Sequence, residues 1–176
     1  MKKIILYIAT SLNGYIAKAN GSVDWLEDIP NPHNENYGYN DLLDSIDTTI
    51  QGNNTYKQII SWGIEFPYKN TVNYVLTNNR NLTDNQHVNF IKEKHIEFIK
   101  NLKLKTGKDI WLIGGGKVNS LLLNNGLIDE IHQFIMPIVI EDGIKLFDSV
   151  KEDLSLKIVD TIVYKSGVIR YRYKVV

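Results

Sequence analysis

Three consecutive glycines, Gly114–Gly116, mark the part of this sequence that is best suited to chemistry. The apolar residues Ile110–Ile113 precede them and predict a strand buried on both faces, and apolar residues follow at helical spacing over 118–122. A strand that turns through glycine into a helix aims free backbone N–H groups at one place, which suits a phosphate. Glycine also lets a flat ligand lie against the backbone. The alternative interpretation is a purely architectural turn.

Two further segments have the same character. Gly52–Thr55 follows a short β-branched run, so its free N–H groups and the Thr55 hydroxyl would be available to a second phosphate; an ordinary helix cap is the alternative. Arg80 closes the segment Thr77–Arg80 after the next strand, and its guanidinium suits a phosphate, although a solvated loop charge is the simpler interpretation. Ligands of open α/β sheets bind beyond the carboxyl ends of strands, so three such ends favour an extended dinucleotide.

The composition excludes several kinds of function. The chain of 176 residues has 20 basic and 20 acidic side chains, and this zero formal charge argues against nucleic acid as a partner. It has no cysteine, which excludes disulfides and thiolate chemistry. Its four histidines lack metal-ligand spacing, so we expect no metal. Its serines have no convincing base and orienting acid, which argues against a hydrolase.

No apolar stretch approaches the length that spans a bilayer. The N-terminal apolar run, Ile4–Ala9, is short and is followed by no small-residue cleavage site, so it predicts a buried first strand rather than a signal peptide. We therefore expect a cytoplasmic protein that has no membrane as a partner.

Local patterns predict one domain, residues 1–176, in which strands and helices alternate. Before the glycine turn, strands are expected at Lys3–Ala9, Tyr15–Ala17, Thr48–Gln51, Val72–Thr77 and Val88–Ile91, and helices at Tyr37–Ser45, from Gly52 through Ile60, and at Glu93–Lys105. A long strand over Ile128–Ile140 and a hairpin of Leu156–Tyr164 with Val168–Val175 follow. This order predicts an α/β fold: a mostly parallel central sheet flanked by helices, with an antiparallel C-terminal hairpin.

An ordered set of segments, from residue 4 to about residue 150, resembles the dihydrofolate reductase-like superfamily. The likeness is closest to stand-alone relatives of the C-terminal reductase domain of riboflavin-biosynthesis enzymes. No single motif is decisive, but the set in this order is specific. The matching segments are Tyr7–Ala17, Gly21–Leu26, Gly52–Tyr56, Val75–Thr77, Asp109–Gly116, Leu127–Ile131, Pro137 and Leu146–Phe147.

The resemblance implies a dihydrofolate reductase-like fold and hydride transfer from NADPH to a small pteridine- or pyrimidine-like heterocycle, with 5-amino-6-(5-phosphoribosylamino)uracil as the leading candidate. It also implies a homodimer through the C-terminal strands. Tyr7, Asp24 and Trp25 would face the substrate. The residues that it assigns to the cofactor, joined by Arg80 from the argument above, are Ala9, Ile16, Gly52, Asn53, Asn54, Thr55, Leu76, Thr77, Asn78, Ile113, Gly114, Gly115, Gly116, Lys117 and Val118.

Asp24 is our candidate catalytic group, because reduction of a heterocycle needs a proton as well as a hydride, often from a carboxyl group. Glu27 and Asp28 are rivals, and a solvated loop acid is the simpler interpretation of Asp24. Trp25 would either stack on a flat substrate or fill the core.

Three places depart from the family pattern, and one of them is the stretch Ile140–Asp142, near Gly143, where a glycine-containing loop is usual. Asn53 stands where such proteins usually carry an arginine, and an amide cannot replace a charge-assisted contact to a phosphate. Arg80 would compensate for that loss. Asn13 stands where the family motif Ser-x-Asp-Gly has an acid. These departures keep an alternative function open: a non-catalytic nucleotide-binding or sensing protein on the same fold.

Overall fold

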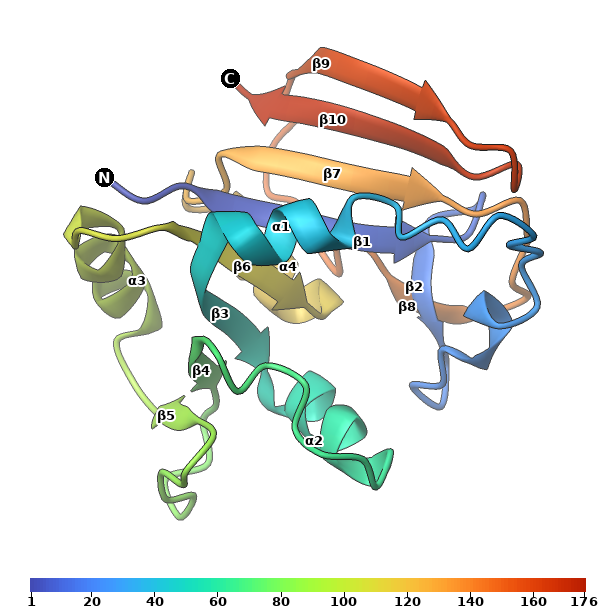
Figure 1. The fold of residues 1–176 in the computed structure, drawn as a ribbon. Helices are drawn as coiled ribbons and strands as arrows, with labels where there is room; N and C mark the ends of the chain where they lie inside the picture. Colours follow the sequence, from blue (N-terminus) through green and yellow to red (C-terminus); the bar gives the residue numbers. More distant parts are fainter.

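One eight-stranded sheet runs through the computed structural model, which describes residues 1–176 (Figure 1). Its spatial order is β5-β4-β3-β6-β1-β7-β10-β9. Neighbours from β5 to β7 are parallel, and β10 is antiparallel to both β7 and β9. The predicted mostly parallel sheet with its antiparallel hairpin is confirmed. The strands are β1 Ile4–Thr10, β3 Ile46–Gly52, β4 Val72–Leu76, β5 Asn89–Ile91, β6 Asp109–Gly114, β7 Glu130–Ile135, β9 Leu156–Val163 and β10 Ile169–Val175.

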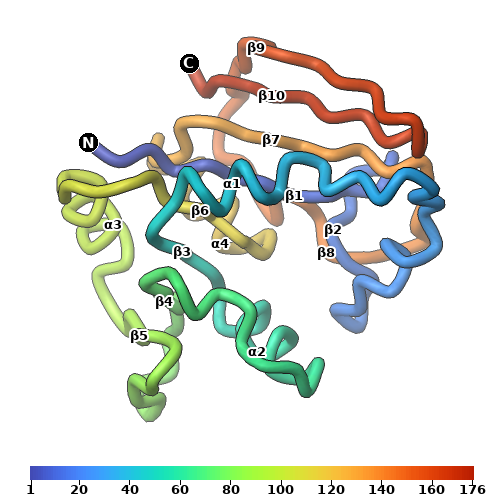
Figure 2. Tube along the Cα trace, viewed as in Figure 1, coloured from blue at the N-terminus to red at the C-terminus, as the bar shows by residue number.

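Four helices cover the two faces of this sheet (Figure 2). On one face α1 buries Leu42 against Ile5 and Trp111, and α2 covers the β4 side. On the opposite face α3 and α4 bury Ile99 and Leu122 in the largest apolar cluster. The helices are α1 Tyr39–Ser45, α2 Asn53–Ser61, α3 His95–Leu104 and α4 Gly116–Leu123, and a short 3-10 helix, η1, spans Asp24–Leu26.

The long strand expected over Ile128–Ile140 is wrong in its extent. Strand β7 ends at Ile135, just before Pro137, which has no N–H for a sheet ladder. The chain then leaves the sheet and forms β8, Gly143–Lys145, which pairs antiparallel with β2, Tyr15–Lys18, in a separate two-stranded sheet. No local pattern predicts β8, because a three-residue strand shows no usable periodicity and its partner is more than a hundred residues away.

The C-terminal hairpin leaves apolar side chains uncovered on its outer strand. Ile158, Val159 and Val163 of β9 are exposed by 56%, 46% and 71%. An apolar edge strand of this kind offers a surface that another chain can bury. The homodimer implied by the resemblance stays a prediction, and these side chains form the surface that it would bury.

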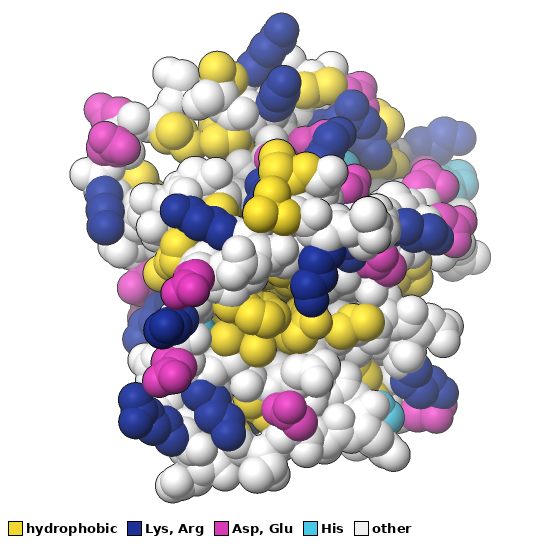
Figure 3. Space-filling view, turned by 90° about the vertical axis from the view of Figure 1, so that its left-hand side faces the viewer, with side chains coloured by type: hydrophobic (Ala, Val, Ile, Leu, Met, Phe, Trp, Pro, Cys, Tyr) yellow, Lys and Arg dark blue, Asp and Glu magenta, His cyan; other side chains and the backbone are white.

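The molecule carries mixed charge on the side where the N-terminus and α3 lie. Figure 3 shows that basic and acidic side chains mingle over this side with hydrophobic ones, rather than gathering into a surface of one sign. None of the helices combines the length and the apolar character needed to cross a bilayer.

Lys103 is a buried cation at the end of the sheet where β1 begins. Its side chain is only 9% exposed, and its Nζ donates to the Leu127 carbonyl at 3.0 Å and to Asp129 Oδ2 at 2.5 Å. The same carboxylate oxygen accepts the N–H of Ile4 at 2.7 Å. One ion pair therefore ties α3 to the starts of β1 and β7.

We expect Lys103→Ala to lower the free energy of unfolding by about 2–3 kcal/mol, because it leaves a partly buried carboxylate and a carbonyl without their cation. Denaturant titration measures the loss. Lys100→Ala, at an exposed position of the same helix, is the matched control and should change stability little. Equal losses in the two variants would contradict the expectation.

Candidate functional site

Two structural constraints require glycine in the turn between β6 and α4. Gly114 has a φ of +113°, which only glycine adopts readily, and a Cβ on Gly116 would collide with the Lys145 carbonyl. Neither constraint applies to Gly115. Its φ is −88°, and a Cβ there would lie 3.4 Å from Thr55 Oγ1 and 3.7 Å from Ile16 Cδ1. The peptide bond between Gly114 and Gly115 is cis. The fold does not require a glycine at 115, so its missing side chain leaves room between the turn, α2 and β2.

The starts of α2 and α4 lie against each other beside this space. Gly52 is the N-cap of α2, and a Cβ on it would lie 3.0 Å from Val118 Cγ2 of α4. Neither helix has a side-chain cap, so Asn53, Asn54 and Thr55 do not serve as the ordinary cap that the sequence left open. Uncapped N–H groups of two helices therefore lie close together. The surface formed by Gly52–Thr55, Gly114–Val118 and the end of β4 is called the groove.

The end of β4 continues the groove. Gly52 is in register with Leu76, and Gln51 with Gly114, so the ends of β3, β4 and β6 are neighbours, as the sequence predicted. Leu76 and Thr77 are buried, whereas Asn78 and Lys117 are exposed. The Gln51 side chain is fully buried and its amide has no hydrogen-bond partner, which is unusual for a polar group next to a strand end.

Arg80 lies in the loop that follows β4. Its side chain is 80% exposed, and its Nη2 is 3.4 Å from Glu93 Oε2. It lines an open depression of about 650 Å³ together with Lys92, Asp84 and Glu93. The two cations in this depression therefore share it with two carboxylates, which weakens the positive field that a phosphate would meet.

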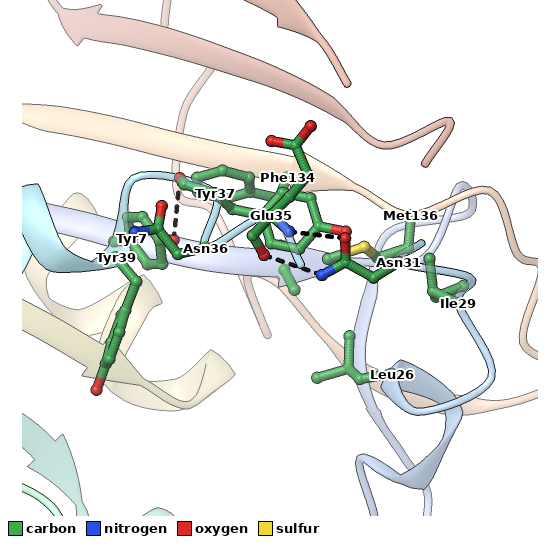
Figure 4. A pocket seen from close by; sticks show the side chains of 11 residues that line it. Tyr7, Leu26, Ile29, Asn31, Glu35, Asn36, Tyr37, Tyr39, Phe134 and Met136 are labelled. Carbon is green, nitrogen blue, oxygen red and sulfur yellow. Dashed lines mark hydrogen bonds between the residues drawn. The ribbon is translucent and has the colours of Figure 1, made fainter. Parts of the chain in front are cut away.

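A second cavity, of about 390 Å³, opens on the α1 face of the sheet (Figure 4). Tyr7 and Ala9 of β1 form one wall, and the Tyr7 hydroxyl donates to the Tyr37 carbonyl at 3.2 Å. Ala9 is in register with Phe134 of β7. The sequence singled out Tyr7 and Ala9 but missed the other lining residues, which are Leu26, Ile29, Asn31, Glu35, Asn36, Tyr37, Tyr39, Phe134 and Met136.

Asp24 and Trp25 do not line this cavity. Asp24 is on the surface, where Lys18 Nζ at 2.8 Å holds the pKa of its carboxyl below the usual range, so it is a poor proton donor. Trp25 is 1% exposed and packs against Phe134 and Met136, so it fills the core, one of the two roles that the sequence left open. The acidic residue that does line the cavity is Glu35, from a loop with no pattern that could have identified it.

The departure at Asn13 has a structural explanation. Its Nδ2 donates to the Ile140 carbonyl at 2.7 Å, and its Oδ1 accepts the N–H of Ile140 at 3.2 Å. An aspartate could accept from the N–H but could not donate to the carbonyl. Asn13 therefore ties the loop after β1 to the loop before β8.

Comparison with known proteins identifies the family. The model of the RibD C-terminal domain family matches residues 2–170. The chain belongs to this family. YwjB of Bacillus subtilis (strain 168), an uncharacterized protein, is 34% identical to it over 91% of each chain.

Solved structures show the same fold. A protein of Shewanella sp. PV-4 that is assigned to riboflavin biosynthesis is 30% identical, with a TM-score of 0.88 over 100% of this chain and 99% of that one. The Thermotoga maritima diaminohydroxyphosphoribosylaminopyrimidine deaminase/5-amino-6-(5-phosphoribosylamino)uracil reductase is 16% identical, with a TM-score of 0.73 over 99% of this chain and 57% of that one. Enterococcus faecalis dihydrofolate reductase, complexed with NADP(H), is 16% identical, with a TM-score of 0.69 over 98% and 96%. The fold is dihydrofolate reductase-like.

Burial favours the neutral forms of Tyr7, in the cavity wall, and of His132, its neighbour on β7. Burial raises the pKa of the Tyr7 phenol, which keeps its hydroxyl protonated. His132 is in register with Tyr7, and their ring centroids are 6.5 Å apart. Burial lowers the pKa of His132, and a contact of 3.1 Å with Glu130 Oε2 offsets part of that effect.

Because the pKa of His132 is lower in the folded protein than in the unfolded chain, the unfolded chain binds this proton more tightly. The contribution of neutral His132 to stability is therefore complete above its unfolded pKa of about 6.5 and is lost as the pH falls toward its folded pKa. We expect His132→Gln to make the free energy of unfolding fall less steeply between about pH 7.5 and about pH 5.5. Denaturant titrations at several pH values measure this, with the exposed His33→Gln as control. Identical slopes in the parent and His132→Gln would contradict it.

Proposed function

We propose that the protein is an NADPH-dependent reductase that acts on a small pteridine- or pyrimidine-like heterocycle. Its family and its likeness to a dihydrofolate reductase complexed with NADP(H) support the proposal. The observation that carries it is the contact between the uncapped starts of α2 and α4, beside a cavity with aromatic walls. Two such helix starts suit the phosphates of a dinucleotide, and the cavity suits a planar ring.

The residues around the groove fit this cofactor. The space above Gly115 is a cradle that a side chain would fill, and Thr55 and Ile16 form its other walls. In the proposal, the segments Ile113–Val118 and Gly52–Thr55 hold the pyrophosphate and its ribose groups. Leu76, Thr77 and Asn78 would contact the adenosine, and Ala9 and Ile16 the nicotinamide, in line with the family resemblance.

The bound cofactor would supply the hydride, and the chain would supply orientation and a dry site. Ala9 belongs both to the proposed cofactor contacts and to the cavity wall, so a ring in the cavity would meet the nicotinamide there. Tyr7 and Phe134 lie 4.5 Å apart between ring centroids and flank this point. Their packing would fix the plane of the substrate and exclude water, which hydride transfer requires.

The proposal is tested in two steps. Calorimetric titration with NADPH measures binding to the groove. The loss of absorbance of the reduced nicotinamide, with a panel of pterins, dihydrofolate and aminopyrimidines, then measures turnover. Binding followed by oxidation with at least one compound supports the reductase. Binding without turnover across the panel would favour the sensing protein, and no binding would reject both.

We expect Gly115→Ala to weaken NADPH binding about tenfold, or about 1.4 kcal/mol, because its methyl group would enter the space proposed for the cofactor. Its neighbours would be at ordinary contact distances, so the melting temperature should change little. Lys100→Ala, at an exposed position of α3, is the control and should leave both binding and the melting temperature intact. Unchanged affinity in Gly115→Ala would place the cofactor elsewhere.

Arg80→Ala tests the phosphate that distinguishes NADPH from NADH. If Arg80 replaces the arginine missing at position 53, the variant should lose several-fold in NADPH affinity and almost none in NADH affinity, because only NADPH carries the extra phosphate. Lys92→Ala, which removes a cation from the same depression, is the comparison. Equal losses for both dinucleotides in Arg80→Ala would reject this role.

A further inference from the structure

We propose that the cavity on the α1 face selects a planar aromatic heterocycle that carries no phosphate group. The inference rests on the proposed function, because it concerns the substrate of that same site, and it separates this chain from a reductase of a phosphoribosylamino-pyrimidine. It follows from the kinds of side chain that line the cavity.

The walls are aromatic and apolar. Eight of the eleven lining residues are hydrophobic, and four of these are the aromatic residues Tyr7, Tyr37, Tyr39 and Phe134. The volume of about 390 Å³ is near the lower end of the range for small-molecule sites, about 300–1,000 Å³. Such walls stabilise a flat ring by burial and by stacking.

The lining has no cation. Its polar members are Asn31, Glu35 and Asn36, and its one charged group is therefore a carboxylate. Figure 4 shows that the Glu35 carboxylate points away from Leu26 and Ile29, while the Glu35 backbone is held by Asn31. A phosphate in this cavity would lose its hydration without gaining a counter-charge, which is costly.

Arg170 is the cation that could supply a counter-charge to a phosphate in this cavity. It is in register with Phe134, and its Nη1 lies 3.7 Å from where a Cβ on Gly38 would be. However, its Nη2 is paired with Asp160, and its side chain is only 17% exposed. It is not among the lining residues. Asp160 already compensates its charge, so a phosphate that reached the remaining donors of Arg170 would gain little counter-charge.

The start of α1 also offers little to an anion. Asn36 already accepts the N–H of Gly38 through Oδ1 at 2.9 Å and the N–H of Tyr39 through its carbonyl at 2.8 Å. Asp41 adds a negative charge in the first turn of the helix. The groove beside Gly115 differs, since neither of its helices has an acidic residue in the first turn and Lys117 is exposed there. Phosphates therefore suit the groove, and an uncharged ring suits the cavity.

Matched ligand pairs test the inference by calorimetry, at fixed ionic strength and with NADP⁺ present. One pair is 6-hydroxymethylpterin and its phosphate ester, and the other is 5-amino-6-(ribosylamino)uracil and its 5′-phosphate. We expect the uncharged member of at least one pair to bind about tenfold tighter than its phosphate ester. An ester that binds as tightly as its partner, or tighter, would overturn the inference, and so would the absence of binding by all four compounds.

Three variants test which side chains cause the preference for the uncharged ligand. Ile29→Lys places a cation in the cavity wall and should narrow or reverse the preference for the uncharged member, whereas Val72→Lys, at an exposed position of β4, should not. If Arg170→Met weakens the phosphate ester alone, Arg170 is a phosphate anchor and the inference fails. Titration with NADPH reports separately on the groove, so failure of the ring preference is distinguishable from failure of the proposed function.

Discussion

The shape of the site depends on a close contact between two backbone segments at the start of α4. The backbone of Gly116 lies against the Lys145 carbonyl, and the Gly116 carbonyl accepts the N–H of Asp148 at 3.3 Å. No side chain fits between these strands of backbone. The approach fixes α4 relative to the small β2–β8 sheet and so sets Ile16 opposite Gly115. The groove is consequently a product of tertiary packing as much as of the glycine turn.

Two chemical environments meet at the end of β1. On one side, uncapped helix starts and exposed Lys117 offer hydrogen-bond donors and positive charge. On the other side, phenol and phenyl rings form a wall in which burial keeps Tyr7 neutral. Ala9 lines the cavity, and in the proposal it also contacts the nicotinamide, so the two ligands would meet at this small side chain. Such a boundary suits hydride transfer, since charge is bound where it is solvated or paired and the reacting ring stays dry.

The sequence predicted that the strand ends at the groove would be neighbours, because the signals for these ends are local. Gly52–Thr55 and Gly114–Gly116 each sit between a strand pattern and a helix pattern, and parallel strands bring such ends together. The cavity could not be predicted in this way. Its walls come from β1, β7, η1 and the loop before α1, and only tertiary packing joins them. Trp25 shows the same limit: residue type alone cannot tell a stacking ring from a core ring, and only its 1% exposure decides.

The departures from the family pattern at Asn13 and Asn53 differ in their structural consequences. Asn13 is explained within the chain, because only an amide can both donate to and accept from the backbone of Ile140. Asn53 has no such explanation within the chain: it leaves the start of α2 without a cation, and Arg80, proposed as the replacement, is paired with Glu93. In the proposed cofactor site, electrostatics would therefore weaken the preference for a dinucleotide with a third phosphate, while pyrophosphate contacts beside Gly115 would be unaffected.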